Sequence, residues 1–307
     1  MNKDLRIVYM GTPEFAVPPL ELLVKEGWPV VAVVTATDKP QGRGRKMLPS
    51  PVKSSAEKLD IPVLQPANLK SPAFQEELKS YRADLQVVVA FRMLPEIVWS
   101  MPPKGTFNLH ASLLPDYRGA APINWAIING ETETGITTFF LQHEIDTGNI
   151  IFQEKEPIYP EDNVGSLYDR LMHKGARLVL KTVEAVASET VKPQKQDDSK
   201  AIHHAPKIYK ETCKIDWSKP AEHVHNLIRG LSPYPVAWTT LNGKTCKIYS
   251  SAVLTENLQD KKAGEHQTDN KTYLSFQTGE GQLSVLELQL EGKKKMDIEN
   301  FLRGNPL

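Results

Sequence analysis

Short apolar runs alternate with amphipathic stretches along the first half of the chain. The runs are rich in β-branched residues and indicate buried strands. We expect these strands at residues 5–10, 30–35, 83–91 and 106–110. Gly11 breaks the first run, and a helical pattern over residues 16–25 follows it. Strands that alternate with helices predict βαβ units and a parallel sheet.

Two further strand-like runs, at residues 134–142 and 149–158, flank a short loop and indicate an antiparallel hairpin. Helical patterns precede and follow this hairpin, at residues 118–129 with Pro122 in the first turn and at residues 163–187. We therefore expect an α/β fold, in which a Rossmann-like, mostly parallel sheet carries helices on both faces.

The composition changes after residue 189. Residues 191–200 are polar and have little to bury, which favours a linker. A helical pattern at residues 221–229 follows, and then short strand-like runs with tight turns, including a hairpin signal at Asn242 and Gly243. This pattern predicts a small, OB-like β-barrel. The expected division is a first domain at 1–189, a linker at 190–208 and a second domain at 209–307.

The overall composition is that of an ordinary globular protein: 40% of the 307 residues are hydrophobic and 24% are charged. No apolar run approaches the roughly 20 residues that span a bilayer, and the charged N-terminal residues do not resemble a signal peptide. The two cysteines, Cys213 and Cys246, form neither a CxxC pair nor a disulfide framework. We therefore expect a cytoplasmic protein without membrane contact, whose cysteines are buried or idle.

The charge is zero overall but uneven along the chain. A zero net charge argues against a general nucleic-acid coat protein. The segment 38–58 is nevertheless basic, because only Asp38 and Glu57 oppose its cations. These cations are Lys39, Arg43, Arg45, Lys46, Lys53 and Lys58. Such a segment is able to bind a polyanion, although a merely solvated loop explains the charge equally well.

Candidate chemistry stands at the end of the strand 106–110. Asn108 and His110 are two residues apart, so both side chains project from the same face of the strand. The carboxyl ends of parallel strands are where such sheets bind their ligands. Asp146, in the short loop of the hairpin, is able to supply a carboxylate to the same place. An amide, an imidazole and a carboxylate together suit an acyl-type transfer.

The sequence around these residues is distinctive. Residues 108–115 read Asn-Leu-His-Ala-Ser-Leu-Leu-Pro, and residues 117–123 read Tyr-Arg-Gly-Ala-Ala-Pro-Ile. Further motifs stand at residues 9–18, 42–46, 127–130, 133–137, 145–148, 215–217 and 228–235. In these motifs the chain resembles the methionyl-tRNA formyltransferases over nearly its whole length.

The resemblance implies transfer of a formyl group from 10-formyltetrahydrofolate to the α-amino group of methionine on the initiator tRNA. It assigns catalysis to Asn108, His110 and Asp146. As hypotheses, the Asn108 amide and a protonated His110 donate hydrogen bonds to the oxyanion, and His110 also moves the proton that leaves the amine. Asp146 then orients His110.

The resemblance also implies where the folate binds, and it implies no metal. The tetrahydrofolate contact is carried over to Ser112, Leu113, Leu114 and Pro115. Backbone contacts are carried over to Arg92 and Met93. Here the chain departs from the family pattern, because Phe91 and Arg92 stand where many relatives have Tyr and Gly. The missing glycine restricts the backbone, and Arg92 adds a charge.

The partners implied are initiator methionyl-tRNA and tetrahydrofolate, with the protein acting as a monomer. Arg43, Arg45 and Lys46 are the expected tRNA contacts, because arginine binds phosphates and stacks on unpaired bases. The first domain then catalyses the reaction and the second binds tRNA. The alternative is a formyltransferase for a UDP-4-amino-sugar, which shares the Ser-Leu-Leu-Pro turn but gives the basic loop no obvious role. Hydrolysis of the folate would likewise leave that loop unexplained.

Overall fold

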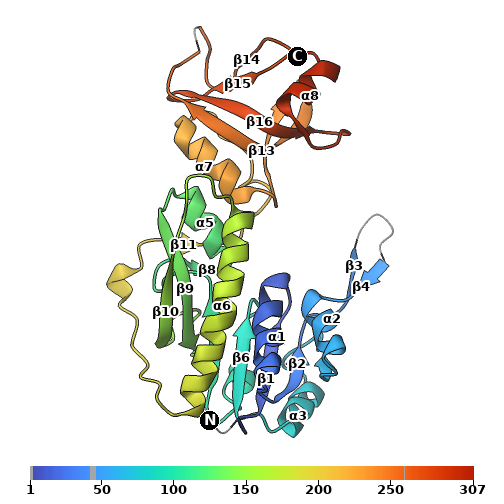
Figure 1. Ribbon diagram of the computed structural model, residues 1–307, viewed down its shortest axis with the longest axis vertical. Coiled ribbons are helices and arrows are strands. Elements are labelled where there is room, and N and C mark those ends of the chain that lie inside the picture. Colours follow the sequence, from blue (N-terminus) through green and yellow to red (C-terminus); the bar gives the residue numbers. More distant parts are fainter. Residues whose placement is uncertain (1–2, 42–45, 259) are drawn as a thin grey trace. The chain divides into compact units, whose positions relative to one another are not determined.

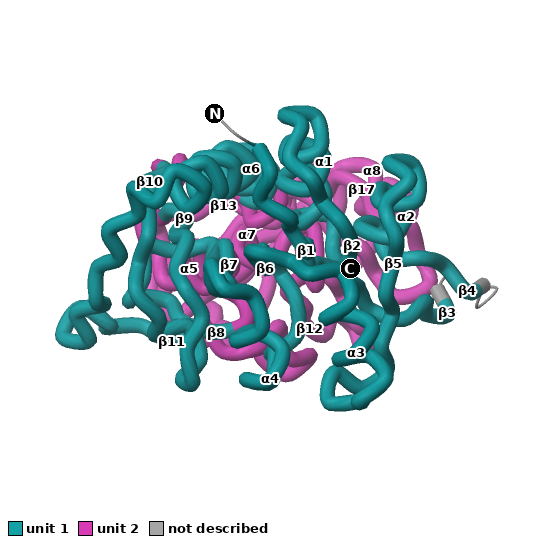
Figure 2. Tube along the Cα trace, turned by 90° about the horizontal axis from the view of Figure 1, so that it is seen from below, with its two compact units in different colours: residues 1–119, 135–156, 168–204 teal, residues 120–134, 157–167, 205–307 magenta. Residues whose placement is uncertain are grey.

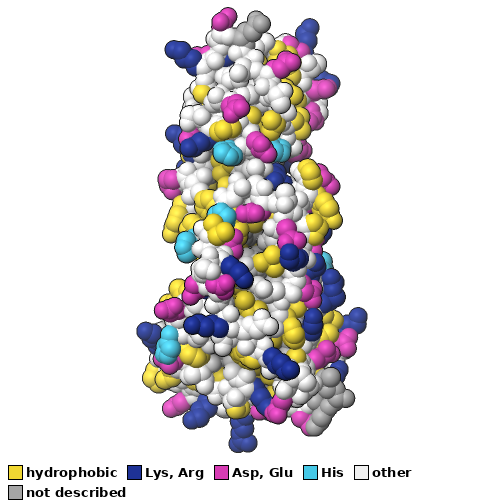
Figure 3. All heavy atoms as spheres, turned by 90° about the vertical axis from the view of Figure 1, so that its left-hand side faces the viewer, with side chains coloured by type: hydrophobic (Ala, Val, Ile, Leu, Met, Phe, Trp, Pro, Cys, Tyr) yellow, Lys and Arg dark blue, Asp and Glu magenta, His cyan; other side chains and the backbone are white. Residues whose placement is uncertain are grey.

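A computed structural model describes residues 3–41, 46–258 and 260–307 (Figure 1). Their contacts divide the chain into two units that are interleaved in sequence (Figure 2). Unit 1 comprises residues 1–119, 135–156 and 168–204, and unit 2 comprises residues 120–134, 157–167 and 205–307. Charged side chains of both signs are interspersed on the face drawn in Figure 3, in keeping with the zero net charge. Within the described residues, no helix is both long and apolar enough to cross a membrane.

Unit 1 is organised around a mixed sheet with the strand order β10-β9-β7-β6-β1-β2-β5. The strands are β1 (Ile7–Gly11), β2 (Val30–Val34), β5 (Val63–Leu64), β6 (Leu85–Val89), β7 (Thr106–His110), β9 (Glu133–Phe140) and β10 (Ile150–Pro157). Strands β5, β2, β1, β6 and β7 pair in parallel, and β9 pairs with β7 antiparallel. The predicted Rossmann-like, mostly parallel sheet is confirmed.

Helices cover both faces of this sheet, as predicted (Figures 1 and 2). They are α1 (Val17–Lys25), α2 (Pro51–Lys58), α3 (Pro72–Ser80), α4 (Glu96–Trp99) and α6 (Val164–Ala187), with 3₁₀ turns η1 (Glu14–Ala16) and η2 (Asp198–Lys200). On one face, Met10 of β1 shares an apolar cluster with Phe74 of α3. On the other face, Leu109 of β7 packs closely on Gly175 of α6. A Cβ added to Gly175 would lie 2.7 Å from Cδ2 of Leu109. Strand β1 is buried throughout because successive side chains enter these two layers.

One helix begins later than predicted. Helix α5 (Pro122–Ile128) starts at Pro122 rather than at residue 118. The preceding residues form strand β8 (Arg118–Gly119), which pairs with β11 (His204–Ala205). Tyr117 and Gly119 have positive φ angles of 56° and 128°, which no α-helix accommodates. This local backbone matters below, because β8 contacts the candidate site.

Unit 2 contains a curled antiparallel sheet with the order β12-β13-β16-β15-β14, and β17 pairs with β16 (Figure 1). The elements are α7 (Ala221–Leu231), β12 (Ala237–Leu241), β13 (Lys244–Leu254), β14 (His266–Thr268), β15 (Leu274–Gln277), β16 (Gln282–Leu290), β17 (Met296–Asp297) and α8 (Ile298–Gly304). The predicted hairpin turn is present, with positive φ at Asn242 and Gly243. Cys213 and Cys246 are both buried and free, as expected. The OB-like prediction is confirmed as a half-barrel.

Two short strands lie within the basic segment of unit 1. Strands β3 (Lys39–Gln41) and β4 (Lys46–Leu48) pair antiparallel. Of the predicted tRNA contacts, Arg43 and Arg45 lie outside the described residues, and Lys46 is described only as the first residue of β4.

Candidate active site

Asn108 and His110 stand at the carboxyl end of β7. Leu109 between them packs against α6 on one face of the sheet, so the side chains of Asn108 and His110 point to the other face, as the alternation predicts. His110 is only 6% exposed. Its Nε2 lies 2.9 Å from the carbonyl oxygen of Tyr117. Since a carbonyl oxygen only accepts hydrogen bonds, Nε2 must be the donor. Nδ1 is then the ring nitrogen that remains for a proton transfer.

Asp146 lies in the loop between β9 and β10. Its Oδ2 accepts a hydrogen bond of 3.1 Å from the backbone N of Gly119. Asp146 has a positive φ of 55°, a conformation that a non-glycine residue adopts only when its surroundings hold it there. Gly148 keeps this loop tight, because a Cβ at that position would lie 1.6 Å from the carbonyl oxygen of Phe140.

One turn, residues 112–119, bonds to both the imidazole and the carboxylate. The His110 ring is tied to Tyr117, and the Asp146 carboxylate is tied to Gly119, two residues further on. Among the described residues, the recorded contacts of His110 and Asp146 do not join them directly. The predicted orienting contact between the two side chains therefore stays a prediction for the substrate complex.

The predicted folate residues 112–115 form the first part of this turn and are largely buried. Ser112 is fully buried, and its Oγ donates to the carbonyl oxygen of Asp116 at 2.7 Å. Leu113 packs on Gly135, where a Cβ would lie 2.5 Å from its Cδ2. Leu114 is 3% exposed and precedes a cis peptide bond to Pro115, which is buried as well. These side chains shape the turn.

Two side chains from the antiparallel hairpin fasten the turn to the sheet. Thr137 Oγ1 donates to the carbonyl oxygen of Ser112 at 2.6 Å and accepts from the backbone N of Leu114 at 3.2 Å. Gln153 Nε2 donates to the carbonyl oxygen of Leu114 at 2.7 Å and to Thr137 Oγ1 at 3.0 Å. Sequence reasoning missed both residues, because the alternation of apolar and polar residues in β9 and β10 does not show that this hydroxyl and this amide bond to the turn.

Arg92 and Met93, the other predicted folate residues, follow β6, which pairs in parallel with β7 and ends at the same edge of the sheet. Ala90 has a positive φ of 46° and turns the chain outward from β6. Arg92 directs its guanidinium to the carbonyl oxygens of Ala67, at 3.2 Å, and Pro66. Met93 is 76% exposed. The charge that Arg92 adds is thus engaged with backbone oxygens.

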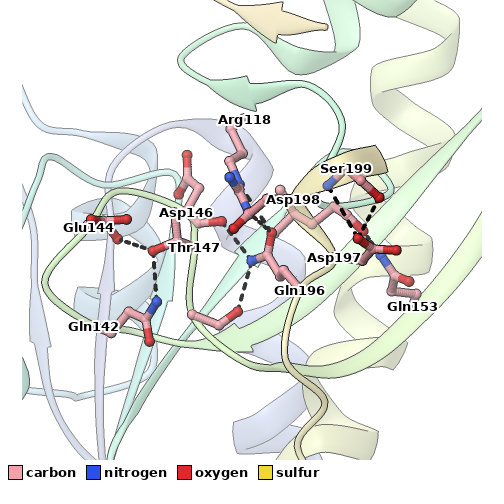
Figure 4. A network of polar contacts seen from close by, with 12 residues as sticks. Arg118, Gln142, Glu144, Asp146, Thr147, Gln153, Gln196, Asp197, Asp198 and Ser199 are labelled. Atoms are coloured by element: carbon pink, nitrogen blue, oxygen red, sulfur yellow. Dashed lines mark hydrogen bonds and ion pairs between the residues drawn. The ribbon is translucent and has the colours of Figure 1, made fainter. Parts of the chain in front are cut away.

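A second group of residues missed by sequence reasoning contacts the Asp146 loop (Figure 4). Gln196 is 5% exposed, although it belongs to the segment predicted to have little to bury. Its side chain contacts the Asp146 loop, and Arg118 contacts both Gln196 and Asp198. Asp197 turns away to cap η2, where hydrogen bonds from the hydroxyl and the backbone N of Ser199 lower its pKa. No periodic signal in this polar stretch marks Gln196.

Within the part of the chain that is described, no group of three or more His, Cys, Asp or Glu residues is placed to hold a metal ion. The arrangement offers an amide, an imidazole and a carboxylate at the edge of a sheet, which suits proton transfer and stabilisation of a developing oxyanion.

Comparison with known proteins bears on the chemistry. A family model described as formyl transferase matches residues 5–183, and one described as formyl transferase, C-terminal domain, matches residues 207–306. A protein named methionyl-tRNA formyltransferase from Bacteroides thetaiotaomicron is 55% identical, over 99% of this chain and 96% of its own. One of the same name from Flavobacterium johnsoniae is 50% identical, over 98% of this chain and 96% of its own.

Solved structures share the fold at much lower identity. The sugar 3N-formyl transferase WlaRD, solved with dTDP and 5-N-formyl-THF, aligns with a TM-score of 0.69 and 21% identity, covering 94% of this chain and 99% of its own. HypX from Aquifex aeolicus in complex with tetrahydrofolic acid aligns with a TM-score of 0.65 and 18% identity, covering 97% of this chain and 46% of its own.

Proposed function

This chain belongs to the methionyl-tRNA formyltransferase family, and on that premise we propose that it transfers the formyl group of 10-formyltetrahydrofolate to the α-amino group of methionyl initiator tRNA. The observation that carries the proposal is the attachment of His110 and Asp146 to one turn beside Asn108. Relatives that bear this name match the chain over nearly its full length, which favours the tRNA over a UDP-4-amino-sugar as the amine.

In the proposed reaction, the α-amino group attacks the formyl carbon, and negative charge develops on the formyl oxygen. The bond between the formyl carbon and N10 of the folate then breaks. The amine loses one proton and N10 gains one. The Asn108 amide donates a hydrogen bond to the developing oxyanion. His110 takes the proton from the amine through Nδ1, because Nε2 is engaged with Tyr117. The Asp146 carboxylate favours the imidazolium that forms, because its negative charge offsets the positive charge of the ring.

The residues of the turn fit a folate in a specific way. Residues 112–115 are largely buried and would form one wall of the folate site, while the exposed Met93 offers apolar surface beside it. A flat pterin ring needs apolar walls and a few backbone hydrogen bonds. We assign the folate contact to residues 112–115 together with Arg92 and Met93.

The proposal extends to the rest of the chain. Residues 1–189 would carry the formyl transfer and residues 209–307 a tRNA-binding surface, joined by residues 190–208. Arg43, Arg45 and Lys46 would bind the tRNA, since their cations suit phosphates and unpaired bases. The protein would act as a monomer in the cytoplasm, where translation begins.

A direct assay tests the function. Purified protein receives 10-formyltetrahydrofolate with methionyl initiator tRNA, methionyl elongator tRNA or a UDP-4-amino-sugar, and the formylated product is identified by mass. We expect the initiator tRNA to gain the formyl group at least about tenfold faster than either alternative, a difference of roughly 1.4 kcal/mol. A preference for the amino sugar would overturn the proposal.

The same assay tests the basic segment. We expect Arg43→Ala to raise the KM for tRNA on the order of tenfold and to leave the Kd for the folate within about twofold. Lys25→Ala, which removes an exposed cation at the end of α1, is the matched control and should change neither. A weakened folate affinity with unchanged use of tRNA would refute the assignment.

A further inference from the structure

The side chain of Gln196 is a buried amide whose hydrogen bonds all serve one end of the candidate site. Nε2 donates to the carbonyl oxygens of Asp146, at 2.7 Å, and Gly148, at 2.8 Å. Oε1 accepts from Arg118 Nε at 3.1 Å and from Arg118 Nη2 at 2.6 Å. A primary amide has two N–H donors and one oxygen with two lone pairs, so Gln196 uses its full capacity here.

The partners also fix which way the amide points. Arginine only donates and a carbonyl oxygen only accepts, so the oxygen of Gln196 must face Arg118 and its NH₂ must face the loop. The main chain delivers Gln196 to this position through Gln194, which exchanges two backbone hydrogen bonds of 2.8 Å with Ile150, the first residue of β10.

These contacts, together with a hydrogen bond from Gly119, close a ring that includes Asp146; Figure 4 draws Arg118, Gln196 and Asp146. The Arg118 side chain holds Gln196, Gln196 holds the Asp146 carbonyl, the Asp146 carboxylate accepts from Gly119, and Gly119 is bonded in sequence to Arg118. Asp146 is thereby fixed from both sides, by its backbone and by its carboxylate. Its positive φ needs such support, because the conformation is unfavourable for a residue with a Cβ.

We propose that Gln196 and Arg118 are positioning residues for the reaction, which keep the Asp146 carboxylate in place beside His110. The inference rests on the catalytic role proposed for Asp146. Neither side chain touches the substrates in this account, and both act through Asp146. A displacement of about 1 Å at a catalytic group is enough to lower a rate on the order of 100-fold.

Two substitutions of Gln196 distinguish the positioning of Asp146 from a role that only fastens residues 191–200 to the protein. Gln196→Ala removes all the side-chain contacts, whereas Gln196→Glu keeps the acceptor for Arg118 and loses both donors to the loop. We expect each to lower kcat by about 10- to 100-fold, with the KM of either substrate within about threefold. Asp198→Ala is the matched control, because it removes the exposed second partner of Arg118 and leaves Gln196 in place. It should change kcat less than about twofold.

A double-mutant cycle supplies the decisive comparison. If Gln196 acts through Asp146, then Gln196→Ala added to Asp146→Ala lowers kcat no further than Asp146→Ala alone. The inference would be overturned if the two substitutions lowered kcat independently, so that their effects multiplied in the double variant. It would also be overturned if Asp146→Ala kept the kcat of the unsubstituted protein. A decline in activity that merely follows the fraction of folded protein in urea titrations would overturn it as well.

Hydrogen exchange gives a readout that needs no substrate. Backbone amides of residues 142–149 should exchange faster in Gln196→Ala than in the unsubstituted protein, and Asp198→Ala should leave their exchange unchanged. Unaltered exchange in Gln196→Ala would contradict the proposed support of the loop. If the protein formylates an amine other than methionyl-tRNA, the proposed function fails, while the cycle run with that amine still tests Gln196.

Discussion

Two segments that leave neighbouring strands at the same edge of the sheet differ sharply in their packing. Residues 112–119 follow β7 and residues 91–97 follow β6, and these strands pair in parallel up to Leu109 and Val89. Ser112 in the first segment is fully buried, whereas Met93 in the second is 76% exposed. The resemblance to formyltransferases assigned both segments to the same co-substrate.

The difference has a cause in the neighbouring elements. Side chains of β9 and β10 bond to the first segment, which also receives the His110 ring and the Asp146 carboxylate. The second segment turns outward at Ala90, and it is held by the Arg92 guanidinium and by Leu94, which is buried in the apolar cluster on that face of the sheet. A proposed shared role in folate binding therefore does not imply a shared role in structure. Substitutions in the first segment should affect stability and catalysis, and those in the second should affect binding.

The largest effect should come from the group that the first segment holds. His110→Ala removes the proposed proton acceptor, and general acid–base groups typically contribute on the order of 10²- to 10⁴-fold in rate. We expect kcat for formyl transfer to fall at least about 100-fold, measured in single turnovers. His204→Ala, an exposed histidine of β11, should keep its rate. If His110→Ala retained more than about a tenth of the activity, His110 would not be the proton acceptor, and its bond to the turn would have no role in catalysis.

The next effect concerns the stability of that turn. Thr137→Val keeps the shape of the side chain but removes the hydroxyl that bonds Ser112, Leu114 and Gln153. Buried partners left unsatisfied cost about 1–3 kcal/mol. We expect the unfolding free energy from urea titrations to fall by that amount, and kcat to fall as well. Thr240→Val, at an exposed position of β12, serves as the control, and an equal loss there would remove the distinction.

The sequence predicts the candidate catalytic residues better than the residues that hold them in place. Alternation along β7 placed Asn108 and His110 on one face, and the hairpin pattern placed Asp146 in a loop near them. Both rest on local periodicity, which a single chain displays directly. The start of α5 was missed because Pro122 and the positive φ of Tyr117 govern it, and only the first of these is visible in the sequence.

The supporting residues could not be predicted for a different reason. Gln196 stands in a polar stretch that has the composition of a linker, and its burial depends on contacts with Arg118 and Asp146, far away in the chain. Hydrogen bonds between distant polar side chains leave no periodic trace. The same holds for Thr137 and Gln153, whose strands would show the same pattern without these contacts.

In the exposed segment, the effect should fall on binding and spare stability. Arg92→Ala and Met93→Ala remove side chains with few buried contacts, so the unfolding free energy should change by less than about 0.5 kcal/mol. We expect the KM for 10-formyltetrahydrofolate to rise a few-fold, roughly 1 kcal/mol or less, with kcat unchanged. Steady-state kinetics beside a urea titration checks both. A large loss of stability would mean that this segment is also a structural element.

The smallest effect concerns the loss of stability at acid pH, which should arise in neither of the two segments. In α7, His225 Nδ1 lies 3.0 Å from Ser251 Oγ, and burial, then the nearby Arg229, lower the pKa of this histidine. Below the ordinary histidine pKa of about 6.5, the unfolded chain binds the proton more readily than the folded one. Stability should therefore decline as the pH falls through this range, and His225→Gln should flatten the decline in urea midpoints between pH 8 and pH 5.5. His223→Gln, an exposed neighbour in the same helix, should keep it. If His225→Gln kept the full decline, the acid sensitivity would have to be sought elsewhere, first at His266, whose pKa is also lowered by burial and then by the nearby Lys261.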